Sequence, residues 1–151
     1  ERLADASATS VQLPELLGRS DYVSIHVTLG PQTRNLIGAH ELALMRPSAY
    51  LINVARGEIV DQVALVKALA ARRIAGAALD VLEEEPPARD DPLLKLPNVL
   101  LTPHAAHYSA KSLEQVRQTA VEDVVRVLAG NPARYPVNRV VDQRTTSRGG
   151  D

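Results

Sequence analysis

The chain contains no cysteine, phenylalanine or tryptophan, and only four of its 151 residues are tyrosines. Without cysteine there is no disulfide bond, no thiolate metal ligand and no cysteine nucleophile. With so few aromatic rings, the chain lacks the stacking platform on which proteins bind single-stranded nucleic acids. The absence of cysteine is compatible with a reducing compartment.

The chain also lacks an excess of charge of one sign and long apolar runs. Seventeen Lys and Arg residues nearly balance eighteen Asp and Glu residues, giving a formal net charge of -1. Because this balance provides no large positive field for a phosphate backbone, we expect no direct nucleic-acid partner. No apolar run approaches the roughly 20 residues that span a bilayer, and residues 1–5 do not read as a signal peptide. We therefore expect a cytoplasmic protein without a membrane partner.

Short apolar runs rich in β-branched residues alternate with helical patterns, which is typical of βαβ units. Asp61 is the predicted N-cap of one helix, and Ser109 or Ser112 that of the last. Strands are predicted at residues 22–27, 49–54, 74–81 and 99–101, and helices at 14–17, 38–45, 61–73 and 109–128. Four buried strands joined by helical crossovers predict an α/β fold with a parallel, doubly wound sheet of the Rossmann type.

Polar side chains follow the predicted strands at the points where a parallel sheet binds its ligands. Thr28 follows the first strand, Arg56 the second, Asp80 and then Glu85 the third, and His104 the fourth. Since the carboxyl ends of parallel strands share one edge, we expect these groups to converge. This convergence from separate parts of the sequence marks the candidate site.

Each of these residues also has a simpler explanation when it is taken alone. His104 could be a satisfied loop histidine, Arg56 a surface guanidinium bonded to its own loop, and Asp80 the cap of a turn. An acidic run such as residues 83–85 is ordinarily a stretch of solvent-exposed charges. The pair of His104 and His107 lacks a third ligand, so we expect no metal site.

Together, the same residue types suit the oxidation of a 2-hydroxy acid by hydride transfer. That reaction needs a base for the hydroxyl proton, and the imidazole of His104 works near neutral pH. A carboxylate beside the ring fixes its tautomer and favours the imidazolium, and Glu85 is the best-placed candidate. The planar, permanently charged fork of Arg56 suits the carboxylate of the substrate.

Three motifs contain these residues, namely Ile52-Asn53-Val54-Ala55-Arg56-Gly57, then Gly76-Ala77-Ala78-Leu79-Asp80-Val81 with Glu85-Pro86, then Asn98-Val99-Leu100-Leu101-Thr102-Pro103-His104. In this order and at this spacing, the motifs resemble the D-isomer-specific 2-hydroxyacid dehydrogenases, the family of phosphoglycerate, glycerate and formate dehydrogenases. The segment at residues 20–27 matches as well, so the resemblance covers roughly residues 13–138.

The resemblance implies catalytic roles for three residues and a nicotinamide cofactor. Arg56 would bind the substrate, a small 2-hydroxy or 2-keto acid, and His104 would be the acid/base. Glu85 would pair with His104, because it lies five residues after Asp80 and directly before Pro86, as in the family pattern. The implied cofactor is NAD, with NADP left open, and Asp80 would hold its carboxamide. The residues expected to line the cofactor are Val27, Thr28, Val54, Ala55, Arg56, Asp80, His104 and Ala105.

Two departures keep alternative functions open. Ala105 and the residues after it stand where most relatives have an Ile-Gly-Gly type sequence. This is closer to the C-terminal-binding-protein branch of NAD-dependent corepressors, which carries Trp at the position of His107. Thr28 stands where many members have Pro. The alternatives are an NAD(H)-sensing, corepressor-like binding protein of the same fold, or a chain that is inactive as it stands.

The glycines of this chain lack the Gly-x-Gly-x-x-Gly spacing with which a dinucleotide fold cradles a pyrophosphate. We therefore expect the C-terminal half of an NAD-binding domain. Residues 1–130 would form a partial dinucleotide-binding domain, 131–142 would return to a substrate domain, and 143–151 would be a disordered tail. In the family the missing half and the dimer-forming arm lie upstream, which implies a homodimer for the full-length parent.

Overall fold

The computed structural model describes residues 8–136 of the chain. The chain forms two compact units, one ending at Ala106 and the other beginning at His107. The predicted tail at 143–151, and the part of the predicted return segment beyond residue 136, lie outside the described residues. The predicted domain boundary at residue 130 stays a prediction.

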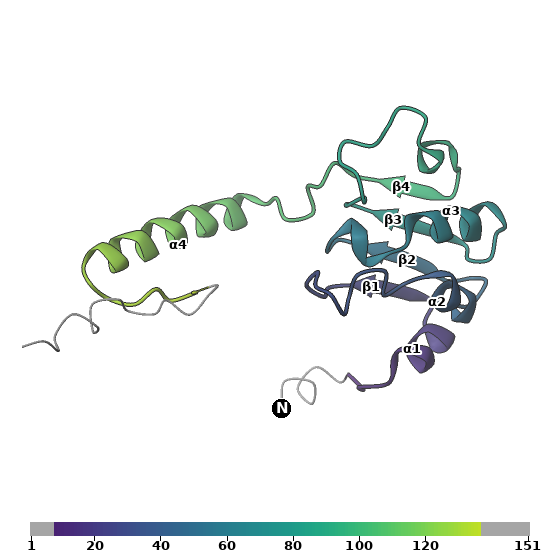
Figure 1. The fold of residues 1–151 in the computed structure, drawn as a ribbon, viewed down its shortest axis with the longest axis horizontal. Coiled ribbons are helices and arrows are strands. Elements are labelled where there is room, and N and C mark those ends of the chain that lie inside the picture. The colour runs from purple at the N-terminus through teal and green to yellow at the C-terminus, as the bar shows by residue number, and fades with distance from the viewer. Residues whose placement is uncertain (1–7, 137–151) are drawn as a thin grey trace, which may run out of the picture. The chain divides into compact units, whose positions relative to one another are not determined.

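The first unit is built on a four-stranded parallel sheet in the order β1-β2-β3-β4 (Figure 1). In register, Val23 lies opposite Leu51, and Leu51 lies opposite Ala77. The predicted α/β fold with a parallel, Rossmann-type sheet is confirmed. The strands are β1 (Tyr22–Ile25), β2 (Tyr50–Asn53), β3 (Gly76–Leu79) and β4 (Val99–Leu101).

Only β4 has the bounds that the sequence predicts. We expected the first strand to run to residue 27, the second to cover 49–54 and the third to cover 74–81, and all three are shorter. The residues beyond Ile25, Asn53 and Leu79 have left the strand ladder and form the loops at the carboxyl edge. The β-branched composition of these segments therefore extends past the paired backbone.

Three helices form one layer against the sheet. α1 (Leu13–Arg19) contacts α2 (Ala39–Leu44), and α2 contacts α3 (Gln62–Ala70). Asp61 caps α3 as predicted, because its carboxylate accepts a hydrogen bond from the amide of Ala64 at 2.9 Å.

Two helical expectations were wrong in detail. The helix expected to close at Gly18 continues to Arg19 and is capped at Ser20, whose backbone N–H donates to the carbonyl of Leu16. The connection between β3 and β4 contains a 3-10 helix, η3 (Pro92–Lys95), where we expected a helical crossover.

The hydrophobic core lies between this helix layer and one face of the sheet. Leu17, Leu42 and Leu69 come from the three helices, and Val23 and Leu51 face them from the strands. Each buried Leu contributes about 1.5–3 kcal/mol relative to an exposed one, so this face holds the sheet in place. On the other face of the sheet, Tyr22 and Tyr50 are exposed and their rings stack with centroids 5.7 Å apart.

The second unit contains a single long helix within its described residues, α4 (Ala110–Leu128). Ser109 is its N-cap, and Ser112 completes a capping box with it, so both predicted serines take part. The chain turns away at Gly130, whose φ of +80° lies in the left-handed region that favours glycine. Within residues 8–136, no helix is both long and apolar enough to cross a membrane.

Candidate active site

The loops after the four strands carry the candidate residues to one edge of the sheet. Because all four strands are parallel and adjacent, their carboxyl ends lie at the same edge. Thr28 follows β1, Arg56 follows β2, Asp80 follows β3 and His104 follows β4. The convergence expected from the sequence is therefore realised by the fold.

Glu85 and His104 are joined by a hydrogen bond between their side chains, although they lie 19 residues apart in the sequence. The Oε2 atom of Glu85 lies 2.7 Å from Nδ1 of His104, and both side chains are partly exposed. A carboxylate can only accept, so this bond places a proton on Nδ1. Nε2 is the ring nitrogen that does not take part in this bond.

The carboxylate of Glu85 is held at both oxygens. Its Oε1 atom accepts a hydrogen bond from the backbone N–H of Leu82 at 2.8 Å. The hydrogen bond from His104 lowers the pKa of Glu85; burial opposes this, and the Leu82 amide and the charge of His104 lower the pKa further. The charge of Asp80 acts in the opposite direction, but the net pKa lies below its ordinary value of 4.5. Glu85 is therefore ionised at neutral pH.

Asp80 holds the loop that carries His104 in place through three hydrogen bonds. Its Oδ1 atom accepts from the hydroxyl of Thr102 at 2.5 Å and from the amide of Ala105 at 2.9 Å, and Oδ2 accepts from the amide of Ala106 at 2.8 Å. Burial raises the pKa of Asp80, but these three bonds and the charge of His104 outweigh it, so its pKa lies below the ordinary value of 3.8. Asp80 is only 6% exposed.

This anchor explains how a histidine adopts an unfavourable backbone conformation. His104 has a φ of 52°, in the left-handed region that costs a residue with a side chain about 1–3 kcal/mol. The consecutive amides of Ala105 and Ala106, which follow it, point into the carboxylate of Asp80, as in the backbone nests that bind anions. The bonds to Asp80 thus offset the strain and fix the backbone from which the imidazole projects.

Replacing Asp80 by Asn should therefore destabilise the chain. We expect a loss of about 1–3 kcal/mol in the free energy of unfolding near neutral pH, because one backbone or hydroxyl donor then meets an NH₂ group. Since the pKa of Asp80 is lowered, its stabilisation is present above pH 3.8 and is lost as the pH falls through the lowered pKa. The difference between wild type and variant should shrink accordingly in urea unfolding of the full chain at decreasing pH.

Asp90→Asn is the matched control, since Asp90 is exposed on a loop. Equal stabilities of wild type and Asp80→Asn near neutral pH would contradict the anchoring role of Asp80.

A buried asparagine shapes the loop that carries Arg56. Asn53, at the end of β2, is 1% exposed. Its Nδ2 donates to the carbonyl of Arg56 at 2.9 Å, and its Oδ1 accepts from the amide of Ala55 at 3.0 Å. The side chain of Asn53 therefore closes a tight turn that presents Arg56 at the sheet edge.

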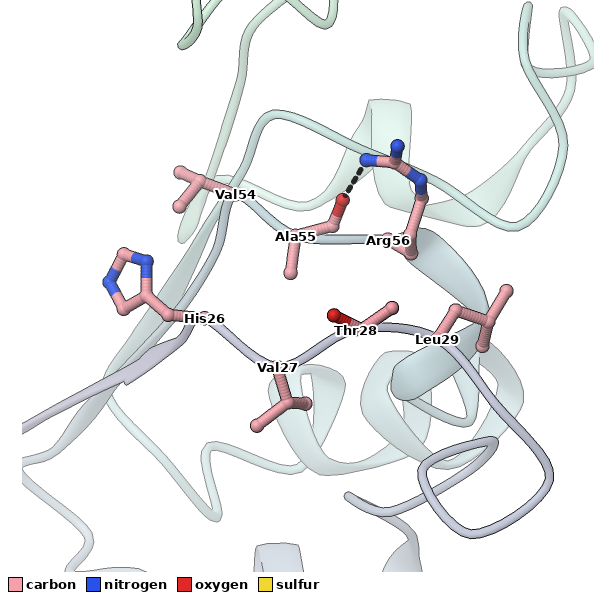
Figure 2. Close-up of a pocket in the computed structure, with 7 residues that line it drawn as sticks. All are labelled: His26, Val27, Thr28, Leu29, Val54, Ala55 and Arg56. Carbon is pink, nitrogen blue, oxygen red and sulfur yellow. Dashed lines mark hydrogen bonds between the residues drawn. The ribbon is translucent and has the colours of Figure 1, made fainter. Parts of the chain in front are cut away.

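A cleft of about 370 Å³ opens between this turn and the loop after β1 (Figure 2). One Nη atom of Arg56 donates to the carbonyl of Ala55 at 2.6 Å, while the guanidinium as a whole remains exposed. The cleft is lined by His26, Val27, Thr28 and Leu29 on one side and by Val54, Ala55 and Arg56 on the other.

The predicted site residues thus fall into two groups. Five of the predicted cofactor-lining residues surround the cleft, namely Val27, Thr28, Val54, Ala55 and Arg56. The others, Asp80, His104 and Ala105, are joined with Glu85 in the hydrogen-bonded network above. Their roles toward a cofactor or substrate stay predictions. Within residues 8–136, no group of three or more His, Asp or Glu side chains is placed to hold a metal ion.

Asn53 and Thr102 also position the loops of the site, and neither was predicted from the sequence. A signal was present for Asn53, a polar residue that interrupts the apolar run Leu51-Ile52-Asn53-Val54. Such a residue is buried only when its amide is fully hydrogen-bonded. For Thr102 no local signal existed, because its partner Asp80 lies 22 residues earlier.

Comparison with known proteins assigns this chain to a family. Residues 1–106 match the family model described as D-isomer specific 2-hydroxyacid dehydrogenase, NAD binding domain. The chain belongs to the D-isomer specific 2-hydroxyacid dehydrogenase family. The resemblance found in the motifs around Arg56, Asp80 and His104 is thereby confirmed, and so is a nicotinamide cofactor as that of the family.

Individual members of the D-isomer specific 2-hydroxyacid dehydrogenase family match most of this chain. The glyoxylate reductase of Korarchaeum cryptofilum (strain OPF8) is 45% identical over 131 residues, which are 87% of this chain and 40% of that protein. The D-3-phosphoglycerate dehydrogenase of Escherichia coli (strain K12) is 45% identical over 142 residues, 91% of this chain and 33% of that protein.

Among solved structures, the NAD-complexed D-isomer specific 2-hydroxyacid dehydrogenase from Lactobacillus delbrueckii ssp. bulgaricus superposes with a TM-score of 0.79 at 37% identity. The match covers 89% of this chain and 44% of that one. The chain therefore spans between 33% and 44% of the length of these three relatives.

Proposed function

We propose that the complete protein is an NAD(P)-dependent D-2-hydroxyacid dehydrogenase. It would transfer a hydride between the nicotinamide and C2 of a D-2-hydroxy acid or its 2-keto acid. The observation that carries this proposal is the Glu85–His104 pair at the carboxyl edge of the sheet, with Arg56 on the neighbouring loop. A base, its orienting carboxylate and a carboxylate-binding guanidinium are the groups that this reaction needs.

The residues present fit one part of a dinucleotide. The side chains of Val27 and Val54, 42% and 36% exposed, offer apolar surface to a flat ring at the cleft. Thr28, Ala55 and Ala105 would complete this lining, and the carboxylate of Asp80 would accept a hydrogen bond from the carboxamide. When bound, the nicotinamide supplies or accepts the hydride.

The side chains of this chain would manage the substrate and its proton. The guanidinium of Arg56 would bind the carboxylate of the 2-keto acid with paired hydrogen bonds. His104, as the imidazolium, would donate the proton at Nε2 to the keto oxygen in the reducing direction and accept it in the oxidising direction. Glu85 would stabilise the imidazolium, because its carboxylate is ionised and bonded to Nδ1.

Replacing Glu85 by Gln should therefore lower kcat. The amide is nearly isosteric but uncharged, and we expect a loss of about 10–100-fold, as for other carboxylates that orient a functional histidine. The measurement is the steady-state rate of 2-keto acid reduction by NADH in the full-length protein. Glu84→Gln is the matched control, because Glu84 is the exposed neighbour in the same loop. Equal rates for Glu85→Gln and Glu84→Gln would contradict the assigned role.

We also propose that the complete protein acts as a cytoplasmic homodimer. This proposal rests on the family resemblance, in which the dimer-forming arm lies outside the part that this chain matches. The balanced charge of the chain supports a small-molecule substrate over a nucleic acid as its partner.

A further inference from the structure

Two loops of the candidate active site touch backbone to backbone at Gly57. Gly57 follows Arg56 directly and is buried. A Cβ atom at this position would lie 1.9 Å from the carbonyl carbon of Leu82, 2.0 Å from its oxygen and 2.4 Å from the amide nitrogen of Glu83. Among the described glycines, only Gly130 has a positive φ, so position 57 needs a glycine for space and not for its dihedral angles.

The peptide that lies against Gly57 belongs to the segment that holds the acid/base pair. The N–H of Leu82 donates to Oε1 of Glu85 at 2.8 Å, and Oε2 of Glu85 lies 2.7 Å from Nδ1 of His104. A displacement of the Leu82–Glu83 peptide would move Leu82, whose own N–H, one peptide group earlier, donates to the carboxylate that orients His104.

A second contact holds the same segment. The amide of Glu83 donates to Oε1 of Gln62, the first residue of α3, at 3.3 Å. The side-chain amide of Gln62 in turn donates to Asp91 at 2.9 Å. Gln62 lies five residues after Gly57. The short stretch from Gly57 to Gln62 therefore contacts the Leu82–Glu83 peptide at two points, through the backbone of Gly57 and the side chain of Gln62.

We infer that Gly57 and Gln62 are positioning residues for the Glu85–His104 pair. Their contacts hold the Leu82–Glu83 peptide against the loop of Arg56 and so fix the position of the pair relative to Arg56. The catalytic meaning of this inference rests on the proposed function. Its geometric content does not, because it concerns only how the carboxylate of Glu85 is held.

Replacing Gly57 by Ala tests the inference directly. The atoms that a Cβ would meet are backbone atoms, which cannot turn aside as a flexible side chain does, so the Leu82–Glu83 peptide must shift. We expect the pKa of Glu85 to rise toward its ordinary value of 4.5, because the carboxylate loses the donor at Leu82 and its alignment with His104. The measurement is an NMR titration of the Glu85 carboxyl carbon in the 151-residue chain. The charged groups that bear on Glu85 are His104 and Asp80, and both remain in the variant.

Gly18→Ala is the matched control. A Cβ at that position has its nearest contact, the carbonyl oxygen of Leu44, at an ordinary 3.9 Å. The control should leave the Glu85 titration as in the wild type. An unchanged titration in folded Gly57→Ala would overturn the inference.

Gln62→Leu decides the question if Gly57→Ala fails to fold. This variant removes the acceptor for the Glu83 amide without adding an atom at position 57. A rise in the pKa of Glu85 supports the inference, and a wild-type titration overturns it. Because neither measurement requires turnover, an inactive protein would contradict the proposed function while leaving this test intact.

The kcat of the full-length protein is a further readout, because a purely structural role of Gly57 would not make its effect depend on Glu85. Gly57→Ala should lower kcat by about 10-fold or more, by misplacing the carboxylate that orients the histidine. In the Glu85→Gln background the same substitution should cost little further, since the charge that it misplaces is already gone. Losses that multiply independently in the double variant would contradict the inference.

Discussion

Replacing His104 by alanine should lower kcat for 2-keto acid reduction by about 10²-fold or more in the full-length protein. The expected loss is large because, among the described residues of the Glu85 network, His104 supplies the imidazole. This imidazole is bonded to the ionised carboxylate of Glu85. The measurement is single-turnover and steady-state kinetics with NADH. His40→Ala serves as the matched control, since His40 is an exposed residue of α2.

The role of Glu85 as the orienting partner depends on the role of His104 as acid/base, but the reverse does not hold. A His104→Ala enzyme that retained near wild-type kcat on its own substrate would remove both. A large loss in His104→Ala with none in Glu85→Gln would keep the base and remove the role of the carboxylate.

Replacing Arg56 by Lys should reduce kcat/KM by about 10–100-fold, although the charge is kept. A planar guanidinium can bind a carboxylate through two parallel hydrogen bonds, whereas an ammonium acts as a point charge. Each hydrogen bond to a charged group contributes about 1.5–3 kcal/mol, which corresponds to a loss of this size. The measurement is the dependence of the initial rate on the concentration of the 2-keto acid.

Arg34→Lys is the control for Arg56, because Arg34 is exposed and its guanidinium lies 3.9 Å from the carboxylate of Glu58. If Arg56→Lys left kcat/KM unchanged, the substrate carboxylate would have to be bound elsewhere. The turn closed by Asn53 would then be a structural feature without a role in binding.

Local patterns in the sequence predicted those features that depend on neighbouring residues. Asp61, and Ser109 or Ser112, were predicted as helix caps because a cap acts within its own first turn, and the structure has Asp61 and Ser109 at these positions. The pairing of Glu85 with His104 was predicted from the family resemblance, and the structure confirms the contact at 2.7 Å. The carboxyl-edge placement of Arg56 and Asp80 followed from the parallel topology alone.

The features that the sequence did not reveal depend on contacts between distant segments. The backbone contact between Gly57 and Leu82 joins residues that are 25 positions apart, and the sequence around neither residue indicates this contact. The anchoring of the His104 loop by Asp80 likewise depends on where β3 and β4 place their ends. Strand ends were misjudged for a related reason: residues 26 and 27 have strand-like composition, but the ladder with β2 has already ended at Ile25.

The most direct test of the central claim is an assay of the full-length protein with NADH or NADPH and a panel of small 2-keto acids, with the configuration of the product determined by chiral chromatography. We predict oxidation of the reduced nicotinamide coupled to formation of the D-2-hydroxy acid from at least one member of the panel. A folded protein that binds NADH but turns over no 2-keto or 2-hydroxy acid, or one that forms the L-isomer, would contradict the account.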